Sequence, residues 1–245
     1  MKALLEGRYP SGSSLPPERE LAAELGVTRP TLREVLKRLD RDGFLTISHG
    51  RPTRVNDLLA EGGLNVLATL VRYGGPLPEG FVRDLLAVRL ALAPAYARAA
   101  VERDPEEVAS LLAEEKLPAD VPGAYASFDW GLHTGLAARS GNPVYRLILN
   151  GFATFYVDLA CLYFAREEAR RASGRFYAEL RAAALARSPE DAEKSVRGAM
   201  AESLALWAET ETETKTEAET ETEAETETET GTETVAVRGV KGRRS

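Results

Sequence analysis

The chain has 245 residues, a net charge of −7 and 44% hydrophobic residues, a composition typical of globular proteins. Its length allows two modest domains with separate cores, and its single cysteine, Cys161, excludes an intramolecular disulfide framework. No uncharged apolar run reaches the roughly 18 residues that a membrane span needs, and no secretory signal pattern is visible. We therefore expect a soluble cytoplasmic protein that makes no membrane contact.

The charge is distributed unevenly along the chain. Residues 1–56 hold ten Lys/Arg and seven Asp/Glu, a net charge of +3, and such a segment attracts phosphate groups. Residues 209–245 carry a net charge of −6 and alternate Glu with Thr over most of their length. This composition predicts a disordered acidic low-complexity tail. A solubilising tail is the simpler interpretation, and an acidic mimic of DNA that competes for the basic segment is the alternative.

Residues 15–54, LPPERELAAELGVTRPTLREVLKRLDRDGFLTISHGRPTR, predict helix, turn, basic helix and hairpin in that order. The first helix runs to Gly26, and the second begins at Thr28, a good N-cap residue. The alternating pattern that follows predicts two strands around a His49-Gly50 tip. Four apolar residues of the second helix are expected to face the core: Leu32, Val35, Leu36 and Leu39. The order is typical of a winged helix-turn-helix, which inserts a helix into the major groove of DNA.

The rest of the chain is predicted to be helical. We expect a mainly α fold in which a winged helix-turn-helix with a small β-hairpin wing (1–57) precedes a linker with a short helix (58–80) and an antiparallel α-helical bundle that binds a ligand (81–208). The bundle is predicted to contain about six helices. Pro94 should kink or divide the helix that begins at residue 81. Asn142 and Pro143 begin the longest apolar element, predicted as one central helix over 142–165.

Two stripes of mostly apolar residues are predicted within the bundle. One lies on the central helix and one on the last helix: Phe152, Tyr156, Leu159 and Tyr163, and Val196, Met200, Ser203 and Trp207. Arg89 and Arg197 lie beside these stripes, where an unpaired guanidinium would be costly. An apolar tunnel with hydroxyl groups and an arginine near its mouth suits an acyl chain with a phosphorylated head group. For each aromatic residue alone, plain core packing is the simpler interpretation.

Several long strings resemble the FadR type of the GntR superfamily of transcription regulators. They are LPPERELA, GVTR-TLREVL-RL-RDG-LTI-HG-PT-VN, GLNVLATL and SGNPVYRLILNG, and the likeness covers most of residues 10–207. The resemblance implies a homodimeric regulator of fatty acid metabolism that binds a palindromic operator in double-stranded DNA. It also implies release by long-chain acyl-CoA, which acts as an effector rather than a cofactor. The alternative is a GntR-superfamily regulator that responds to a different small molecule. Repression or activation depends on where the operator lies.

The resemblance also implies which residues contact DNA and ligand. The expected DNA contacts are Arg19, Thr28, Arg29, Thr31, Arg33, His49 and Gly50. An arginine fork can bind guanine O6 and N7, and threonine hydroxyls suit phosphates. The ligand contacts that the resemblance implies are Tyr163, Arg197, Met200, Ser203 and Trp207, and the stripe pattern adds Arg89 and Tyr156. Two positions depart from the family pattern. Pro30 stands where a threonine is expected, and Met200 stands where a glycine is expected and would narrow the tunnel.

Three other functions are less consistent with the residues. Wider GntR relatives bind a metal through an Asp and three His, and Asp129 and His133 have the spacing with which such a site begins. The chain has only two histidines, so we expect no metal site, and we expect His133 to bond Asp129 or other polar groups nearby. An acyl-CoA thioesterase would need a nucleophile–base pair, and none is visible, so we expect no enzyme. The large bundle disfavours a non-specific architectural DNA binder.

Overall fold

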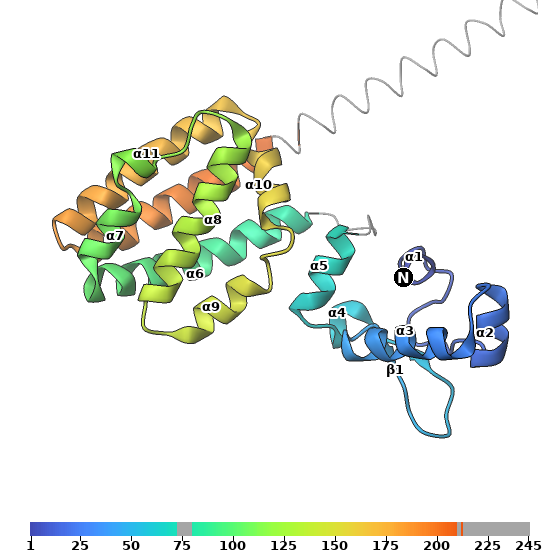
Figure 1. Ribbon diagram of the computed structural model, residues 1–245. Helices are drawn as coiled ribbons and strands as arrows, with labels where there is room; N and C mark the ends of the chain where they lie inside the picture. Colours follow the sequence, from blue (N-terminus) through green and yellow to red (C-terminus); the bar gives the residue numbers. More distant parts are fainter. Residues whose placement is uncertain (73–79, 210–211, 213–245) are drawn as a thin grey trace, which may run out of the picture.

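The computed structural model describes residues 1–72, 80–209 and 212. Its first part is a winged helix-turn-helix and its second a bundle of helices (Figure 1). The elements of the first part are α1 (Lys2–Leu5), α2 (Glu18–Glu24), α3 (Arg29–Arg41), β1 (Leu45–Thr46), β2 (Arg54–Val55), α4 (Leu58–Glu61) and α5 (Leu64–Arg72). The predicted mainly α fold with a small hairpin is confirmed.

Helix α3 forms because its first turn and one of its faces both favour a helix. Thr28 caps the N-terminus, and its Oγ1 accepts a hydrogen bond from the Thr31 N–H at 3.3 Å. Three leucines of this helix are buried in the N-terminal core: Leu32, Leu36 and Leu39. The prediction that Val35 faces the core is wrong, because its side chain is 48% exposed. Val35 lies at the edge of the leucine stripe and faces solvent.

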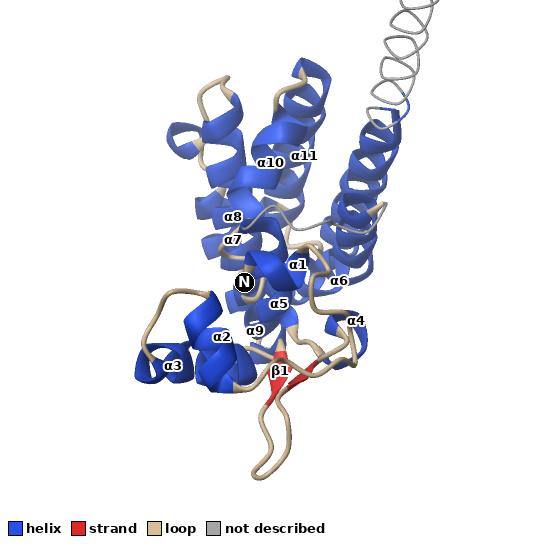
Figure 2. Cartoon of the chain, turned by 90° about the vertical axis from the view of Figure 1, so that its right-hand side faces the viewer, coloured by secondary structure: helices blue, strands red, loops and turns tan. Residues whose placement is uncertain are grey.

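The wing is a short antiparallel hairpin. Its register pairs Leu45 with Val55 and Thr46 with Arg54, and Leu45 and Val55 are buried. Residues 47–53 form a loop, which Figure 2 shows extending away from the helices. The sequence pattern predicts longer strands than these. Alternation indicates which side chains face the core, but it does not indicate where the ladder of backbone hydrogen bonds ends.

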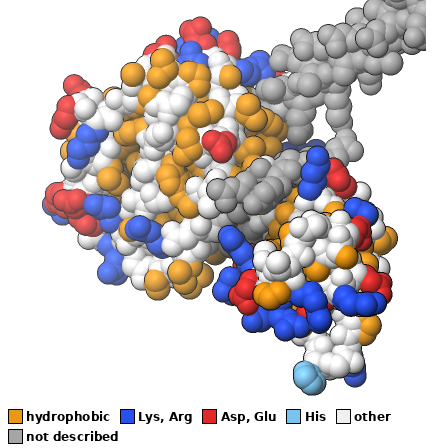
Figure 3. Space-filling model, turned by 45° about the vertical axis from the view of Figure 1, so that its right-hand side comes forward, with side chains coloured by type: hydrophobic (Ala, Val, Ile, Leu, Met, Phe, Trp, Pro, Cys, Tyr) orange, Lys and Arg blue, Asp and Glu red, His pale blue; other side chains and the backbone are white. Residues whose placement is uncertain are grey.

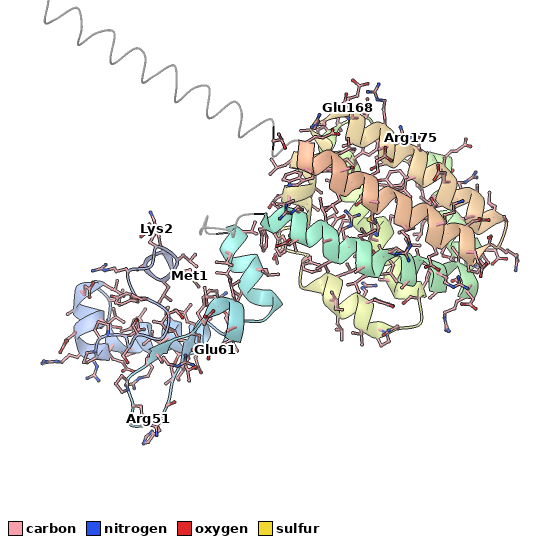
Figure 4. The ribbon with its side chains drawn as sticks, turned by 180° about the vertical axis from the view of Figure 1, so that it is seen from behind. Met1, Lys2, Arg51, Glu61, Glu168 and Arg175 are labelled. Carbon is pink, nitrogen blue, oxygen red and sulfur yellow. The ribbon has the colours of Figure 1, made fainter. Side chains whose placement is uncertain are left out.

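The second part consists of packed helices, and no strand occurs in the part of it that the structure describes. Its elements are α6 (Phe81–Arg103), α7 (Pro105–Leu111), a 3-10 turn (Glu114–Lys116), α8 (Pro122–Arg139), α9 (Pro143–Asn150), α10 (Tyr156–Phe164), α11 (Glu167–Leu185) and a last helix over 189–209. The last helix lies between α6 and α11 (Figures 1 and 4). Ion pairs join it to both neighbours, Arg98–Glu190 to α6 and Arg175–Glu202 to α11.

The structure contradicts one prediction about the bundle helices and one of the two outcomes predicted at Pro94. The apolar element over 142–165 is not one helix, because residues 151–155 form turns between α9 and α10. Asn142 does cap its start, accepting a hydrogen bond from the Val144 N–H at 3.0 Å. Gly151 follows α9, where a glycine disfavours continuing the helix, and the turns let α10 pack along α8. Pro94 does not divide α6, which continues through it to Arg103 with Pro94 itself buried.

The segment after the wing packs on the winged domain. Asp57 caps α4, and Val66 and Leu70 of α5 are buried in the same core as the α3 leucines. Most of the predicted tail over 209–245 lies outside the described residues. Within those residues, no helix is both long enough and apolar enough to cross a membrane.

Candidate DNA interface and bundle pocket

The N-terminal turn of α3 and the hairpin form an exposed basic surface. Figure 3 shows Lys and Arg side chains gathered over the winged domain beside the hairpin. Thr28 and Thr31 are exposed, and their hydroxyl oxygens lie 2.8 Å apart. Because the first backbone N–H groups of a helix have no intrahelical partner, this end attracts anions such as phosphates.

The three predicted arginines of this surface are all exposed, but they are not equivalent. Arg33 binds Glu18 with both ends of its fork, Nε to Oε1 at 3.3 Å and Nη2 to Oε2 at 2.6 Å. Hydrogen bonding from Arg33 lowers the pKa of Glu18 below its usual value. Arg19 and Arg29 form no hydrogen bond or ion pair with other described residues. Their guanidinium groups are therefore available to DNA without first leaving a carboxylate.

The tip of the wing is exposed and basic. His49 and Gly50 lie in the loop over 47–53, and Gly50 has a φ of 72°, a conformation that favours glycine. Arg51 lies at the end of the hairpin (Figure 4). Our list of predicted DNA contacts did not include Arg51, although its place beside the predicted His49-Gly50 turn could have indicated it.

A narrow apolar cavity of about 70 Å³ lies between α6, the α9–α10 segment and the last helix. Its lining includes Arg89, Tyr156, Tyr163 and Trp207 among the predicted ligand residues, with apolar side chains such as Leu85. Pockets that enclose drug-sized ligands are usually about 300–1,000 Å³. A long acyl chain would therefore have to widen this cavity.

A second and smaller hollow, about 10 Å³, shares Arg89 and Tyr163 with the apolar cavity. Met200 and Ser203 line it, and Tyr163 Oη donates to Ser203 Oγ at 3.1 Å. Six of the seven predicted ligand residues therefore meet around these two spaces. Arg197 does not join them, since its side chain is 58% exposed and pairs with Glu193 at 2.8 Å.

A buried polar network closes one wall of both spaces. Asp129 Oδ2 accepts from Arg89 Nη2 at 2.7 Å and from Tyr156 Oη at 2.5 Å, while Tyr177 Oη donates to Asp129 Oδ1 at 3.2 Å. Burial is the largest single influence and would raise the pKa of Asp129, but the charge of Arg89, the neighbouring His133 and the hydrogen bonds from Tyr156 and Arg89 together hold the pKa below its usual value. The carboxylate therefore stays ionised and neutralises the buried guanidinium. Asp129 was not among the predicted ligand residues.

His133 extends this network through the second of the two predicted alternatives, a bond to another polar group nearby. Its Nδ1 lies 2.6 Å from Tyr96 Oη, whereas its Nε2 is 3.6 Å from Asp129 Oδ1, too far for a hydrogen bond. Burial and the nearby charge of Arg89 lower the pKa of His133 to about 3, so the imidazole is neutral. Among the described residues, no group of three or more His, Cys, Asp or Glu is placed to hold a metal ion.

Two family models match the chain and meet at the end of the wing, so that α4 and α5, which pack on the winged domain, fall within the second match. Residues 2–55 match the family model described as bacterial regulatory proteins, gntR family, and residues 56–218 match the FadR C-terminal domain. The "Fatty acid metabolism regulator protein" of Yersinia pestis (strain Pestoides F) is 42% identical over 207 residues, which cover 84% of this chain and 87% of that protein. The protein of the same name from Yersinia pseudotuberculosis serotype O:1b (strain IP 31758) gives the same values.

Among solved structures, that of Lar is similar, with a TM-score of 0.56 and 16% identity over 84% of this chain and 91% of that chain. Its title states that Lar controls the expression of the Listeria monocytogenes agr system. At this identity the likeness shows the fold alone.

Proposed function

This chain belongs to the gntR family of bacterial regulatory proteins, and we propose that it binds a palindromic operator as a homodimer that long-chain acyl-CoA releases. It is a DNA-binding transcription regulator of fatty acid metabolism, not an enzyme. A homodimer presents two recognition helices, so its symmetry sets the spacing of two half-sites. We place it in the cytoplasm, where it would meet DNA.

The exposed end of α3 supports the DNA part of this proposal. Arg29 stands at the first helical position, beside the Thr28 cap, and forms no hydrogen bond or ion pair with a described residue. A guanidinium there can enter the major groove and bind guanine with two donors, while Thr28, Thr31 and the helix N-terminus bind phosphates. The exposed loop with His49 and Gly50 suits an approach to the minor groove, because Gly50 has no side chain. Arg51 adds a positive charge to this loop.

The proposal that acyl-CoA is the ligand rests on the apolar cavity of the bundle, which has one charged side chain, Arg89, in its lining. Arg89 and Tyr163 line the same space as apolar side chains such as Leu85 and Trp207. The apolar side chains suit an acyl chain, and the polar wall suits a carbonyl oxygen. Arg197 is on the exposed surface of the last helix, where a phosphorylated head group that stays outside the cavity could reach it.

The small size of the cavity indicates that ligand binding is coupled to a change in the arrangement of the bundle helices. An acyl chain can enter only if the surrounding helices shift, so the ligand binds one shape of the bundle better than the other. Such differential binding typically changes the affinity at a second site by about 1–3 kcal/mol. We propose that the shifted shape spaces the two recognition helices wrongly for the operator.

A second candidate is a regulator of the same kind with a different effector. Met200 favours it, because this side chain is only 3% exposed and lines the smaller hollow, where the family pattern has glycine. A smaller or shorter acyl compound would fit such a space more easily than oleoyl-CoA.

Both candidates are tested by titrating the protein into a labelled FadR-type palindromic duplex at moderate salt, with and without oleoyl-CoA. Tight binding that weakens with oleoyl-CoA is the expected result, and a random duplex of equal length is the control. If the protein binds the operator tightly and oleoyl-CoA does not change its affinity, sequence-specific DNA binding remains supported and the second candidate is favoured. Equal affinity for both duplexes would contradict sequence-specific binding.

A further inference from the structure

Arg54 in β2 and Glu61 at the end of α4 join the hairpin to the segment that leads toward the bundle. Arg54 Nη1 donates to Glu61 Oε1 at 2.9 Å, and Arg54 Nη2 donates to Glu61 Oε2 at 2.5 Å. The Asp57 N–H donates to the same Oε1 at 3.0 Å. Because two donors match two acceptors, the bridge fixes orientation as well as distance. Glu61 lies at the root of the hairpin and Arg51 at its far end (Figure 4).

Hydrogen bonds continue from this bridge across the hairpin. Thr46 Oγ1 accepts from Arg54 Nη2 at 3.5 Å and donates to Asn56 Oδ1 at 2.7 Å. Asn56 Nδ2 then donates to two backbone carbonyls in the turn and strand that follow α3, each at 3.1 Å. Asn56 is buried, so these bonds are shielded from water. Glu61 is thus connected through side chains to both strands and to the end of the recognition helix.

Close backbone packing holds α4 in the same place. A Cβ on Gly62 would lie 2.3 Å from the Leu58 carbonyl oxygen and 2.7 Å from Val66 Cγ2. A Cβ on Gly43, which follows α3, would lie 3.7 Å from Gly62 Cα. The backbone after α4 therefore lies close to the turn after α3, and only a glycine fits at position 62 without a shift. With Val66 buried, α4 and the start of α5 are attached to the winged domain.

We propose that the Arg54–Glu61 bridge is the positioning contact through which the segment leading to the bundle sets the orientation of the wing. This inference rests on the proposed function, in which a ligand of the bundle changes the affinity for DNA. Each strand of the hairpin has only two paired residues, so the orientation of the loop depends on contacts at its root. A displacement of α4 acts directly on Arg54, and β2 carries it to the wing loop.

The bridge can be broken without unfolding the domain. The Arg54 and Glu61 side chains are 41% and 38% exposed, and exposed ion pairs contribute little to folding. Hydrogen bonding from Arg54 lowers the pKa of Glu61 to about 2, so the carboxylate is charged at neutral pH. Glu61→Gln removes this charge with little change in volume. Glu24→Gln is a matched control, because Glu24 pairs with Arg8 across the same domain, is 36% exposed and makes no contact with α4 in the described structure.

The test measures operator Kd with and without oleoyl-CoA for the full-length wild type, E61Q, R54Q, the double variant and E24Q. If the wild-type ratio of the two Kd values lies in the usual range of about 5–150, E61Q and R54Q should each retain less than about a third of it. The double variant should lose no more than either single variant, because both break one contact. A loss of affinity from Arg54 at the DNA itself would change both Kd values equally and leave the ratio intact.

A second readout does not depend on the effector. Amide hydrogen exchange of peptides covering residues 44–57 should be at least about threefold faster in E61Q than in wild type or E24Q. Faster exchange with a reduced ratio supports the bridge as the positioning contact. The proposal is overturned if residues 44–57 exchange as slowly in E61Q as in wild type. It is also overturned if the ratio of the two Kd values is unchanged in E61Q. If oleoyl-CoA leaves the wild-type Kd unchanged, the proposed effector fails, and exchange at the hairpin alone then decides for or against the bridge.

Discussion

The winged domain and the bundle place their most informative arginines in opposite surroundings. Arg29 is exposed at the start of α3 and forms no hydrogen bond or ion pair with a described residue, so its guanidinium is available to an outside ligand. Arg89 lies mostly inside the bundle, with 18% of its side chain exposed, and is bound by Asp129, with Tyr156 bonding the same carboxylate oxygen. The comparison separates two roles of one residue type. Loss of the exposed arginine should reduce DNA binding and leave folding intact, whereas loss of the buried pair should reduce folding first.

The largest effect is expected from Asp129→Ala in the bundle. This change leaves the charge of Arg89 buried without a partner, so the free energy of unfolding should fall by about 3–5 kcal/mol. Urea denaturation monitored by circular dichroism measures it. The double variant Arg89→Leu/Asp129→Leu is the control and should regain much of the loss, because no unpaired charge remains. If the single variant unfolds like wild type, the buried pair is not structural and the comparison fails.

The second largest effect is expected from Arg29→Ala, which removes the exposed arginine of the winged domain and should weaken operator binding. The variant should lose about 1–3 kcal/mol of specific operator binding per half-site, with an unchanged melting temperature. Fluorescence anisotropy with operator and random duplexes measures this. Arg41→Ala is the control, because Arg41 is an exposed cation in the last turn of the same helix. An equal loss in both variants would mean that Arg29 contributes charge but not base recognition.

The pH dependence of stability sharpens the comparison inside the bundle. Neutral His133 has a pKa of about 3 in the fold, against an ordinary value of 6.5. Between these values the unfolded chain binds more protons, so stability falls as the pH falls from 6.5 toward 3. From pH 7 to 5.5 this histidine should cost about 1 kcal/mol.

His133→Phe should remove that contribution, as measured by urea denaturation at both pH values. Tyr96→Phe is the control, since it removes the same hydrogen bond but keeps the titrating ring. An unchanged slope in His133→Phe would assign the pH dependence to other groups.

The smallest effect is expected from Tyr163→Phe at the boundary of the two spaces. The change removes one hydrogen bond to Ser203 and should lower stability by about 0.5–1.5 kcal/mol. Tyr125→Phe provides a comparison within the bundle, because the Tyr125 hydroxyl has no hydrogen bond among the described residues. If Tyr163→Phe is as stable as wild type, the hydrogen bond from Tyr163 to Ser203 contributes no net stability.

Local patterns predicted the winged domain better than the bundle. The cap at Thr28, the glycine at position 50 and the three buried leucines of α3 follow from neighbouring residues and were visible in the sequence. The limits of these rules also show in this domain. Val35 has helical spacing but faces solvent, and the hairpin is shorter than its alternation suggests, because neither pattern specifies how far the core extends.

The sequence by itself determined the order of helix, turn, helix and hairpin in the winged domain, its basic charge and the family, since these depend on residue types and their spacing. Only the tertiary structure decided that the 142–165 element divides, that Arg197 lies apart from the cavity, and that His133 bonds Tyr96 rather than Asp129. It also showed that Asp129 pairs with Arg89, 40 positions away. Such pairings depend on how whole helices pack, and the periodicity of one helix indicates which face is apolar but not what it meets.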